Sequence, residues 1–158
     1  MAKLVGWREW VSLPNLGVER VKVKVDTGAR TSAVHASDVE VFDRDGQEWV
    51  RFQLQPLQDN QHLRVACEEP VAEWRTIRDS GGHEERRIII VTDIQVDDEV
   101  WPIELSLTDR EHMGFRMLLG RRAIRNRFYV DPTQSFILSR PISEDYDHEE
   151  EEEEQDKH

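Results

Sequence analysis

The chain has 158 residues and a formal net charge of −12, with 33 acidic residues against 21 lysines and arginines. This length supports one domain with its own hydrophobic core, and the single cysteine, Cys67, excludes an intramolecular disulfide. No apolar run is long enough for a signal peptide or a membrane-spanning helix. We therefore expect a protein of the reducing cytoplasm with no membrane partner.

The negative charge is concentrated at the C-terminal end. Residues 144–158 hold ten acids and one lysine, and six of these acids are the consecutive glutamates at 149–154. Adjacent glutamates repel one another and offer nothing apolar to bury. The sequence therefore predicts a folded domain over residues 1–141 and a disordered acidic tail over residues 142–158.

The folded part is expected to be all-β. Apolar residues recur with period 2 between Val5 and Ser139, and turn signals fall about every ten residues, which is typical of strands. The segments that show such alternation or short apolar runs are residues 21–25, 39–41, 50–54, 63–67, 88–91, 100–107, 117–119, 128–130 and 135–138.

The connections between these strands carry their own signals. Asp45-Gly46 is a typical hairpin turn. Residues 76–87 are polar around a Ser-Gly-Gly tip, which predicts a projecting hairpin. Residues 121–127 contain good helix formers and predict one short helix. The last two strands are expected to form a final hairpin around residues 131–134.

One strand end is a candidate catalytic position. Residues 21–25 alternate valine with lysine, so the valines face the core and Asp26 follows at the end of the strand. Gly28 lets the backbone turn and approach other groups closely, and Thr27 supplies a hydroxyl that can hold the turn. A plain alternative is an Asx turn that only closes the strand.

Two segments now occur in a recognisable order. Residues 25–36 read VDTGARTSAVHA, and residues 119–123 read LGRRA after a glycine-tipped hairpin, with further matching residues as far as Phe136. This order resembles the retropepsin-like aspartic peptidases over most of residues 5–139. It is most similar to a bacterial RimB-like family that is labelled ATP-dependent zinc protease and is associated with RimK-type enzymes that add glutamates to a ribosomal protein.

The resemblance implies a retropepsin-like closed barrel with one short C-terminal helix and the activity of an aspartic endopeptidase. That chemistry uses two carboxylates that share one proton, because two carboxyl groups so close together cannot both be ionised. The chain has one Asp-Thr-Gly, so a two-fold homodimer would pair Asp26 with its own copy. Thr27 and Gly28 would support the catalytic pair, and Gly81 and Gly82 in the projecting hairpin would contact the bound peptide.

The expected substrate is an acidic, glutamate-rich protein end. Viral retropepsins carry an acid at the position of Arg30, which pairs with the arginine that corresponds to Arg121. Two arginines repel, so Arg30 is free to meet an acidic peptide, or alternatively to pair with a surface glutamate. The residues expected to bind substrate are Ala29, Arg30, Gly81, Gly82 and Arg121. The glutamates at 149–154 resemble such a substrate and are a candidate occupant of the same cleft.

A zinc-dependent peptidase is the main alternative, because of the label of the family. A metallopeptidase helix carries two histidines four residues apart, but His83-Glu84-Glu85-Arg86-Arg87 ends in arginine. The other candidate ligands lack ligand spacing, and no phosphate-binding loop for ATP is present, so we predict neither a metal nor another cofactor. These scattered candidates are His35, His62, His112 and Cys67.

Single features of the sequence raise three further possibilities. His35 lies nine residues beyond Asp26 and is expected to be a hydrogen-bonded structural histidine. Asp131 precedes Pro132 and is expected to be a turn acid rather than a second catalytic acid. The arginines between 116 and 127 lack interleaved exposed aromatics, so nucleic acid is not an expected partner. A module of the same fold that binds acidic peptides without cutting them stays open.

Overall fold

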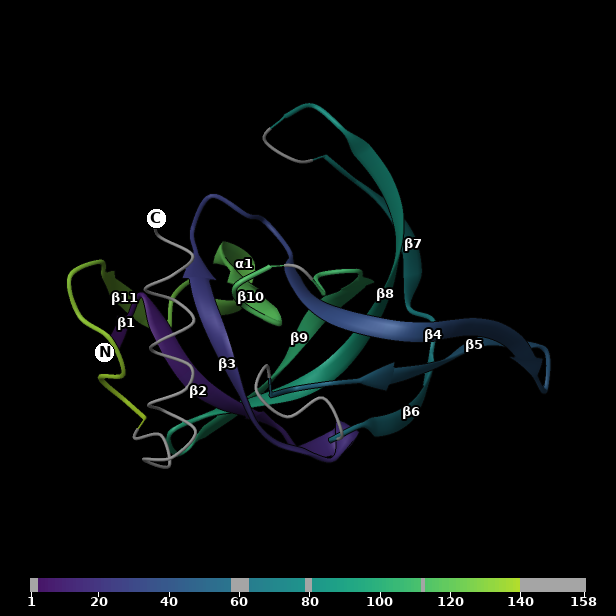
Figure 1. Cartoon of the computed structure of the whole chain (residues 1–158), viewed down its shortest axis with the longest axis horizontal. Helices are drawn as coiled ribbons and strands as arrows, with labels where there is room; N and C mark the ends of the chain where they lie inside the picture. Colours follow the sequence, from purple (N-terminus) through teal and green to yellow (C-terminus); the bar gives the residue numbers. More distant parts are fainter. Residues whose placement is uncertain (1–2, 58–62, 79–80, 112, 140–158) are drawn as a thin grey trace.

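The computed structural model describes residues 3–57, 63–78, 81–111 and 113–139, and the predicted acidic tail lies outside them (Figure 1). The described part is all-β, as predicted, with one four-residue α-helix, α1. No helix within it has the length and apolarity that crossing a membrane requires. The strands are β1 Lys3–Gly6, β2 Arg8–Leu13, β3 Val18–Asp26, β4 Ser32–Arg44, β5 Gln47–Leu54, β6 Val65–Pro70, β7 Glu73–Arg78, β8 Glu84–Val96, β9 Glu99–Thr108, β10 Met117–Gly120 and β11 Phe128–Asp131; a 3-10 turn covers Pro14–Leu16 and α1 covers Arg121–Ile124.

One nine-stranded sheet contains most of the strands. Its order is β10-β3-β2-β8-β9-β4-β5-β6, with β7 paired to β8. Strand β10 is parallel to β3 on one side and antiparallel to β4 on the other, so the pairings from β10 through β3, β2, β8, β9 and β4 return to β10. Strands β1 and β11 form a separate parallel pair.

The hydrophobic core lies inside this sheet. The valines of residues 21–25 are buried as the alternation predicts, and Lys24 between them is exposed. Lys22 is the exception, because it is also buried and its Nζ lies 5.2 Å from the ring centroid of Phe115. The largest side chains with almost no exposure are Phe52, Leu13, Leu54, Ile89, Ile90, Ile94, Leu105, Met117 and Leu119.

Two predicted hairpins are confirmed. Asp45 and Gly46 join β4 to β5 with φ angles of 54° and 82°, the left-handed conformation that such tight turns need. Strands β7 and β8 pair from Glu73 with Ile89 to Arg78 with Glu84, and their hairpin arches away from the sheet over the β3–β4 loop (Figure 1). We call this β7–β8 hairpin the flap.

The predicted short helix is present, and it is shorter than expected. It begins at Arg121 and ends at Ile124, because Arg125 has an extended ψ of 133° and Asn126 has a positive φ of 67°. The helix therefore covers a single turn immediately after Gly120.

The predicted final hairpin is wrong. Strand β11 pairs with β1, and residues 135–138 form no strand. The physical reason is Glu9, a fully buried carboxylate on β2. It accepts hydrogen bonds from the backbone N–H of Ile137 at 2.9 Å, that of Leu138 at 3.2 Å and the hydroxyl of Ser139 at 2.7 Å. The two backbone donors bond to a side chain and are therefore not available to a strand ladder.

Candidate functional site

Asp26 is the last residue of β3 and stands half-buried at the start of a tight loop. Its Oδ1 accepts a hydrogen bond from the backbone N–H of Gly28 at 3.0 Å, and its carbonyl accepts one from Ala29 at 3.2 Å. The loop is therefore an Asx turn. Within the described part of the chain Oδ2 has no hydrogen-bond partner, so one carboxylate oxygen is available for chemistry.

The second motif packs directly behind this loop. Gly120 lies opposite Asp26 in the parallel β10–β3 pair, and its N–H donates to Ser32 Oγ at 3.0 Å. A Cβ on Gly120 would lie 2.8 Å from the carbonyl carbon of Thr31 and 3.0 Å from the carbonyl oxygen of Ala29. Only glycine allows the two segments to approach this closely.

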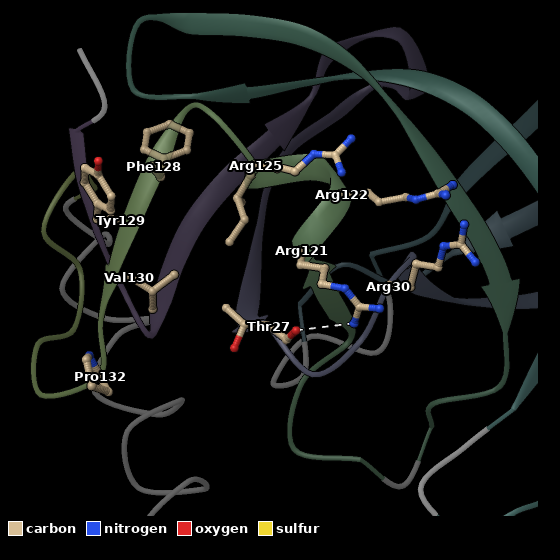
Figure 2. A pocket seen from close by; sticks show the side chains of 10 residues that line it. Thr27, Arg30, Arg121, Arg122, Arg125, Phe128, Tyr129, Val130 and Pro132 are labelled. Carbon is tan, nitrogen blue, oxygen red and sulfur yellow. Dashed lines mark hydrogen bonds between the residues drawn. The ribbon is translucent and has the colours of Figure 1, made fainter.

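Arg121 braces the loop from the start of the helix. Its Nη1 donates to the carbonyl oxygen of Thr27 at 3.5 Å (Figure 2). It also donates to the carbonyl oxygen of Gly28 at 3.2 Å. Its backbone N–H donates to Ala29 O at 2.8 Å. Backbone carbonyls thus take the place of the acid that pairs with this arginine in viral retropepsins, and Arg30 forms no ion pair within the described residues.

A basic cleft of about 620 Å³ lies between this loop and the flap. We call it the flap cleft. The loop, strand β7 of the flap and α1 form its walls. The flap arches over the loop (Figure 1). Five guanidinium groups line it, so it is suited to an anionic ligand. The lining residues are Gly28, Ala29, Arg30, Thr31, Arg75, Thr76, Ile77, Arg78, Arg121 and Arg122.

A second, larger hollow of about 790 Å³ lies on the other side of α1. Arginines form one wall and apolar residues of β11 form the other, and Thr27 lies at its edge (Figure 2). We call it the β11 groove. Its lining residues are Thr27, Arg30, Arg121, Arg122, Ile124, Arg125, Phe128, Tyr129, Val130 and Pro132.

The structure brings most of the predicted site residues together. Four of them, Gly28, Ala29, Arg30 and Arg121, line the flap cleft, and Asp26 and Thr27 begin the same loop. Gly81 and Gly82 lie at the flap tip and are not among the lining residues; Gly82 has a φ of 85°.

Sequence reasoning missed three arginines of the flap cleft. Arg75 and Arg78 come from β7 and Arg122 from α1. The nearest signal was the run of arginines after Gly120, which predicted a basic cluster without showing which members face the cleft. The two β7 arginines depend on how the flap folds over the loop, and local sequence does not encode this.

Comparison with known proteins places this arrangement in a family. Residues 4–141 match the model described as retropepsin-like aspartic endopeptidase RimB. The chain belongs to this RimB-like family. Two similar curated proteins are both named "Probable alpha-L-glutamate ligase": one from Desulfotalea psychrophila is 43% identical over 142 residues and 90% of this chain, and one from Shewanella pealeana is 44% identical over 135 residues and 85% of it.

This RimB-like chain spans only about a third of those relatives, 31% of the first and 30% of the second. A solved structure of similar fold is a protein of unknown function from Legionella pneumophila. The two structures agree with a TM-score of 0.73 over 88% of this chain and 100% of the other, at 23% sequence identity. At this identity the likeness supports the fold.

Two minor predictions about the RimB-like chain are confirmed. Asp131 is a turn acid, because its Oδ1 accepts hydrogen bonds from the backbone N–H of Thr133 at 2.9 Å and from the Thr133 hydroxyl at 2.7 Å. His35 is structural, because it is only 5% exposed and its Nδ1 accepts a hydrogen bond from the backbone N–H of Arg110 at 2.8 Å. Across the ranges that the structure describes, no three histidine, cysteine or acidic side chains come together as a metal-binding group.

His35 should make the stability of the domain depend on pH. Burial and the nearby Arg116 guanidinium lower its pKa below the usual 6.5, against the opposing effect of Asp109. Between the two pKa values the unfolded chain binds more protons than the folded one, so the free energy of unfolding should decrease as pH falls below about 6.5. Urea denaturation at several pH values measures this slope. His35→Gln should reduce it, and an unchanged slope would contradict the assignment.

Proposed function

We propose that this chain is an aspartic-type endopeptidase that acts as a homodimer and hydrolyses peptide bonds in glutamate-rich protein tails. The observation that carries the proposal is the position of Asp26. Its carboxylate begins the loop whose residues 28–31 line a cleft rich in arginine, and one of its oxygens accepts no hydrogen bond from the described residues. A projecting hairpin arches over this loop (Figure 1). An acid, a lid and a basic peptide cleft are the parts that such a reaction needs.

In the proposed mechanism, Asp26 of each protomer faces its copy across the two-fold axis. The pair holds one proton, because two carboxylates in contact cannot both ionise. The ionised carboxylate takes a proton from water, whose oxygen attacks the peptide carbonyl carbon. The protonated carboxylate donates its proton to the carbonyl oxygen, which gives a tetrahedral intermediate. As the C–N bond breaks, the proton taken from water passes to the leaving amine nitrogen, and the proton on the former carbonyl oxygen returns to the carboxylate that donated it. The chain's own residues supply this chemistry without a metal or other cofactor.

The neighbours of Asp26 have supporting roles in this proposal. Thr27 is exposed at the edge of the β11 groove, and its hydroxyl bonds to nothing in the described part of the chain, so it can bond across the dimer axis. Gly28 leaves room for the substrate backbone, and Gly81 and Gly82 at the flap tip would contact the bound peptide.

The β11 groove supports the dimer. Leu4 of β1 and Tyr129 of β11 lie side by side in the parallel pair and are 51% and 68% exposed, beside the apolar wall of the groove. Such a patch next to the active-site loop is suited to a second copy of the chain. Burying it would bring the two loops toward one another.

Charge and relatives both support an acidic substrate. Five arginines line the flap cleft, and Arg30 and Arg121 are among those predicted to bind substrate. The curated relatives are named alpha-L-glutamate ligase, and a region similar to this chain makes up about 30% of each. A chain that joins both activities would let a peptidase act on the glutamates that a ligase adds. If this is the substrate, the protein would act in the cytoplasm.

We extend the proposal to the architecture and bounds of the domain. The ring of pairings from β10 back to β10 is what a closed, retropepsin-like barrel requires. Residues 1–141 would then form the peptidase domain, and the acidic tail over residues 142–158 lies outside the described residues. This tail resembles the proposed substrate, so deleting residues 142–158 should increase the affinity for an added acidic peptide if it occupies the flap cleft.

The test compares cleavage of a glutamate-tailed peptide with cleavage of a matched glutamine-tailed peptide. We expect cleavage of the glutamate-tailed peptide alone, and we expect a chelator to leave it unchanged. The activity per protomer should fall on dilution, because the dimers separate. Loss of cleavage with the chelator would instead favour the zinc peptidase. Binding of the glutamate peptide without any cleavage would favour the non-catalytic module.

A further inference from the structure

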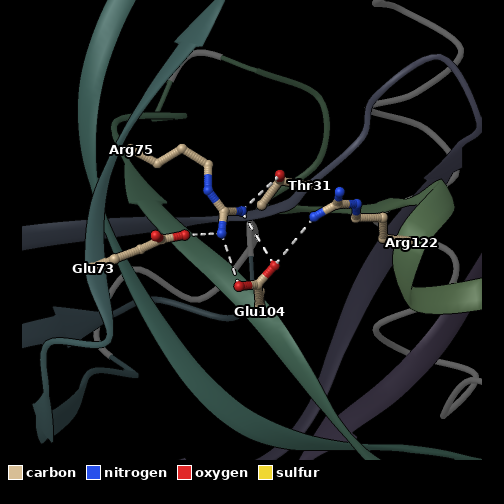
Figure 3. A network of polar contacts seen from close by, with 5 residues as sticks. All are labelled: Thr31, Glu73, Arg75, Glu104 and Arg122. Carbon is tan, nitrogen blue, oxygen red and sulfur yellow. Dashed lines mark hydrogen bonds and ion pairs between the residues drawn. The ribbon is translucent and has the colours of Figure 1, made fainter.

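Arg75 on β7 connects the flap to the loop that carries Asp26 (Figure 3). Its two terminal nitrogens donate to both carboxylate oxygens of Glu104, at 3.2 Å and 2.8 Å. One of them also donates to the hydroxyl of Thr31 at 3.3 Å, and the other contacts Glu73. The guanidinium thus has partners on three different segments.

These partners place Arg75 at a junction of the site. Thr31 ends the Asp26 loop, and its carbonyl carbon packs against Gly120. Glu104 is on β9, the strand that pairs with both β8 and β4. Glu104 Oε1 also lies 3.9 Å from Nη1 of Arg122 on α1. Flap, loop, sheet and helix therefore meet at one carboxylate.

Strand β7 is held by backbone hydrogen bonds on one side. Among the described residues it pairs with β8 and with no other strand, so its position over the loop depends on side-chain contacts. Trp74 donates to Glu48 at 2.7 Å and ties the base of β7 to β5. In the described part of the chain, Arg75 makes the one side-chain hydrogen bond between β7 and the Asp26 loop.

The geometry of the contact requires arginine. A planar guanidinium can bond both oxygens of one carboxylate and still reach a third group, whereas a lysine ammonium is a point charge with no such fork. The side chains of Arg75 and Glu104 are 24% and 40% exposed, so solvent screens this pair less than the Arg78–Glu84 pair, whose side chains are 70% and 49% exposed.

We propose that Arg75 is a positioning residue that, through Glu104 and Thr31, fixes the flap over the Asp26 loop at the separation needed to close on a peptide. This inference rests on the proposed function only in naming the peptide as the ligand. The contact itself has a readout that needs no catalysis, because a flap released from the loop exposes its backbone amides more often.

The experiment is a double-mutant cycle on the full chain with Arg75→Gln, Glu104→Gln and the double variant. Amide hydrogen exchange is measured in the flap, over residues 76–78 and 84–87, and in the core strand β3. We expect each single change to speed flap exchange about tenfold, the effect of losing a charge-assisted pair. The double variant should exchange no faster than the faster single variant.

The matched control is the same cycle on Arg78 and Glu84, an Arg–Glu pair that lies wholly within the flap. Those changes should alter flap exchange by less than about twofold, as exposed pairs do. With the glutamate-tailed peptide, Arg75→Gln should raise KM more than it lowers kcat, because the flap closes less tightly around the substrate.

Several results would overturn the proposal. Flap exchange within twofold of the wild type in Arg75→Gln would do so, as would full additivity in the double variant. Equal acceleration in β3 would show that the variant unfolds as a whole, which also contradicts a local role. Faster flap exchange in a protein that never cleaves the peptide supports the positioning role while the peptidase function fails.

Discussion

Replacing Asp26 with asparagine is expected to reduce peptide cleavage by about 10²–10⁴-fold or more, the usual contribution of a general acid–base group. Asparagine has the shape of aspartate, and its side-chain oxygen can still accept the 3.0 Å hydrogen bond from Gly28. The amide cannot ionise or release a proton, so neither carboxylate role of the proposed pair remains. The measurement is the initial cleavage rate of the glutamate-tailed peptide, together with the free energy of unfolding, which should change little.

Asp131→Asn is the matched control for this change. Asp131 also ends a strand and also holds an Asx turn, with a backbone N–H at 2.9 Å, but it ends β11 and does not begin the loop that lines the flap cleft. Its variant should cleave the peptide at the wild-type rate. Mixing wild type with excess Asp26→Asn should lower the activity beyond simple dilution, because mixed dimers carry one acid. Cleavage that persists in Asp26→Asn would rule out the carboxylate pair.

Strand β3 could be predicted because its signals are local. Residues 21–25 alternate strictly, and the alternation fixes which face of β3 is buried. Gly28 and Gly46 mark tight turns, and the Ser-Gly-Gly segment marks the flap tip. A run of β3, flap and β10 in this order was enough to indicate the family, which the match over residues 4–141 confirms.

Long-range polar contacts could not be predicted in this way. Nothing in the local sequence marks Glu9 as buried, yet its carboxylate is fully buried and hydrogen-bonds to residues 137–139, which are about 130 positions away. Arg75 and Glu104 are 29 positions apart, and no local pattern indicates their contact either. Charged residues are read by default as exposed, and only the tertiary arrangement shows which of them are enclosed.

Gly120→Ala is expected to destabilise the domain by about 1–3 kcal/mol or more, the cost of forcing a methyl group into a packed site. The backbone conformation is not the cause, because Gly120 has a φ of −81° that alanine adopts readily. The cause is the 2.8 Å separation between the added Cβ and the Thr31 carbonyl carbon, a backbone atom that cannot rotate away. Strand β10 or the loop must shift, and urea denaturation measures the loss.

Gly28→Ala separates the stability of this site from its activity. A Cβ there would meet only Oδ1 of Asp26, at 3.2 Å, and that is a side-chain atom that can move. The free energy of unfolding should therefore change by less than about 1 kcal/mol. Cleavage should fall much more, since any movement of Oδ1 displaces the proposed catalytic carboxylate. A Gly120→Ala variant as stable as the wild type would contradict the close packing of β10 against the loop. A Gly28→Ala variant with full activity would contradict the role of the Asp26 carboxylate position in cleavage.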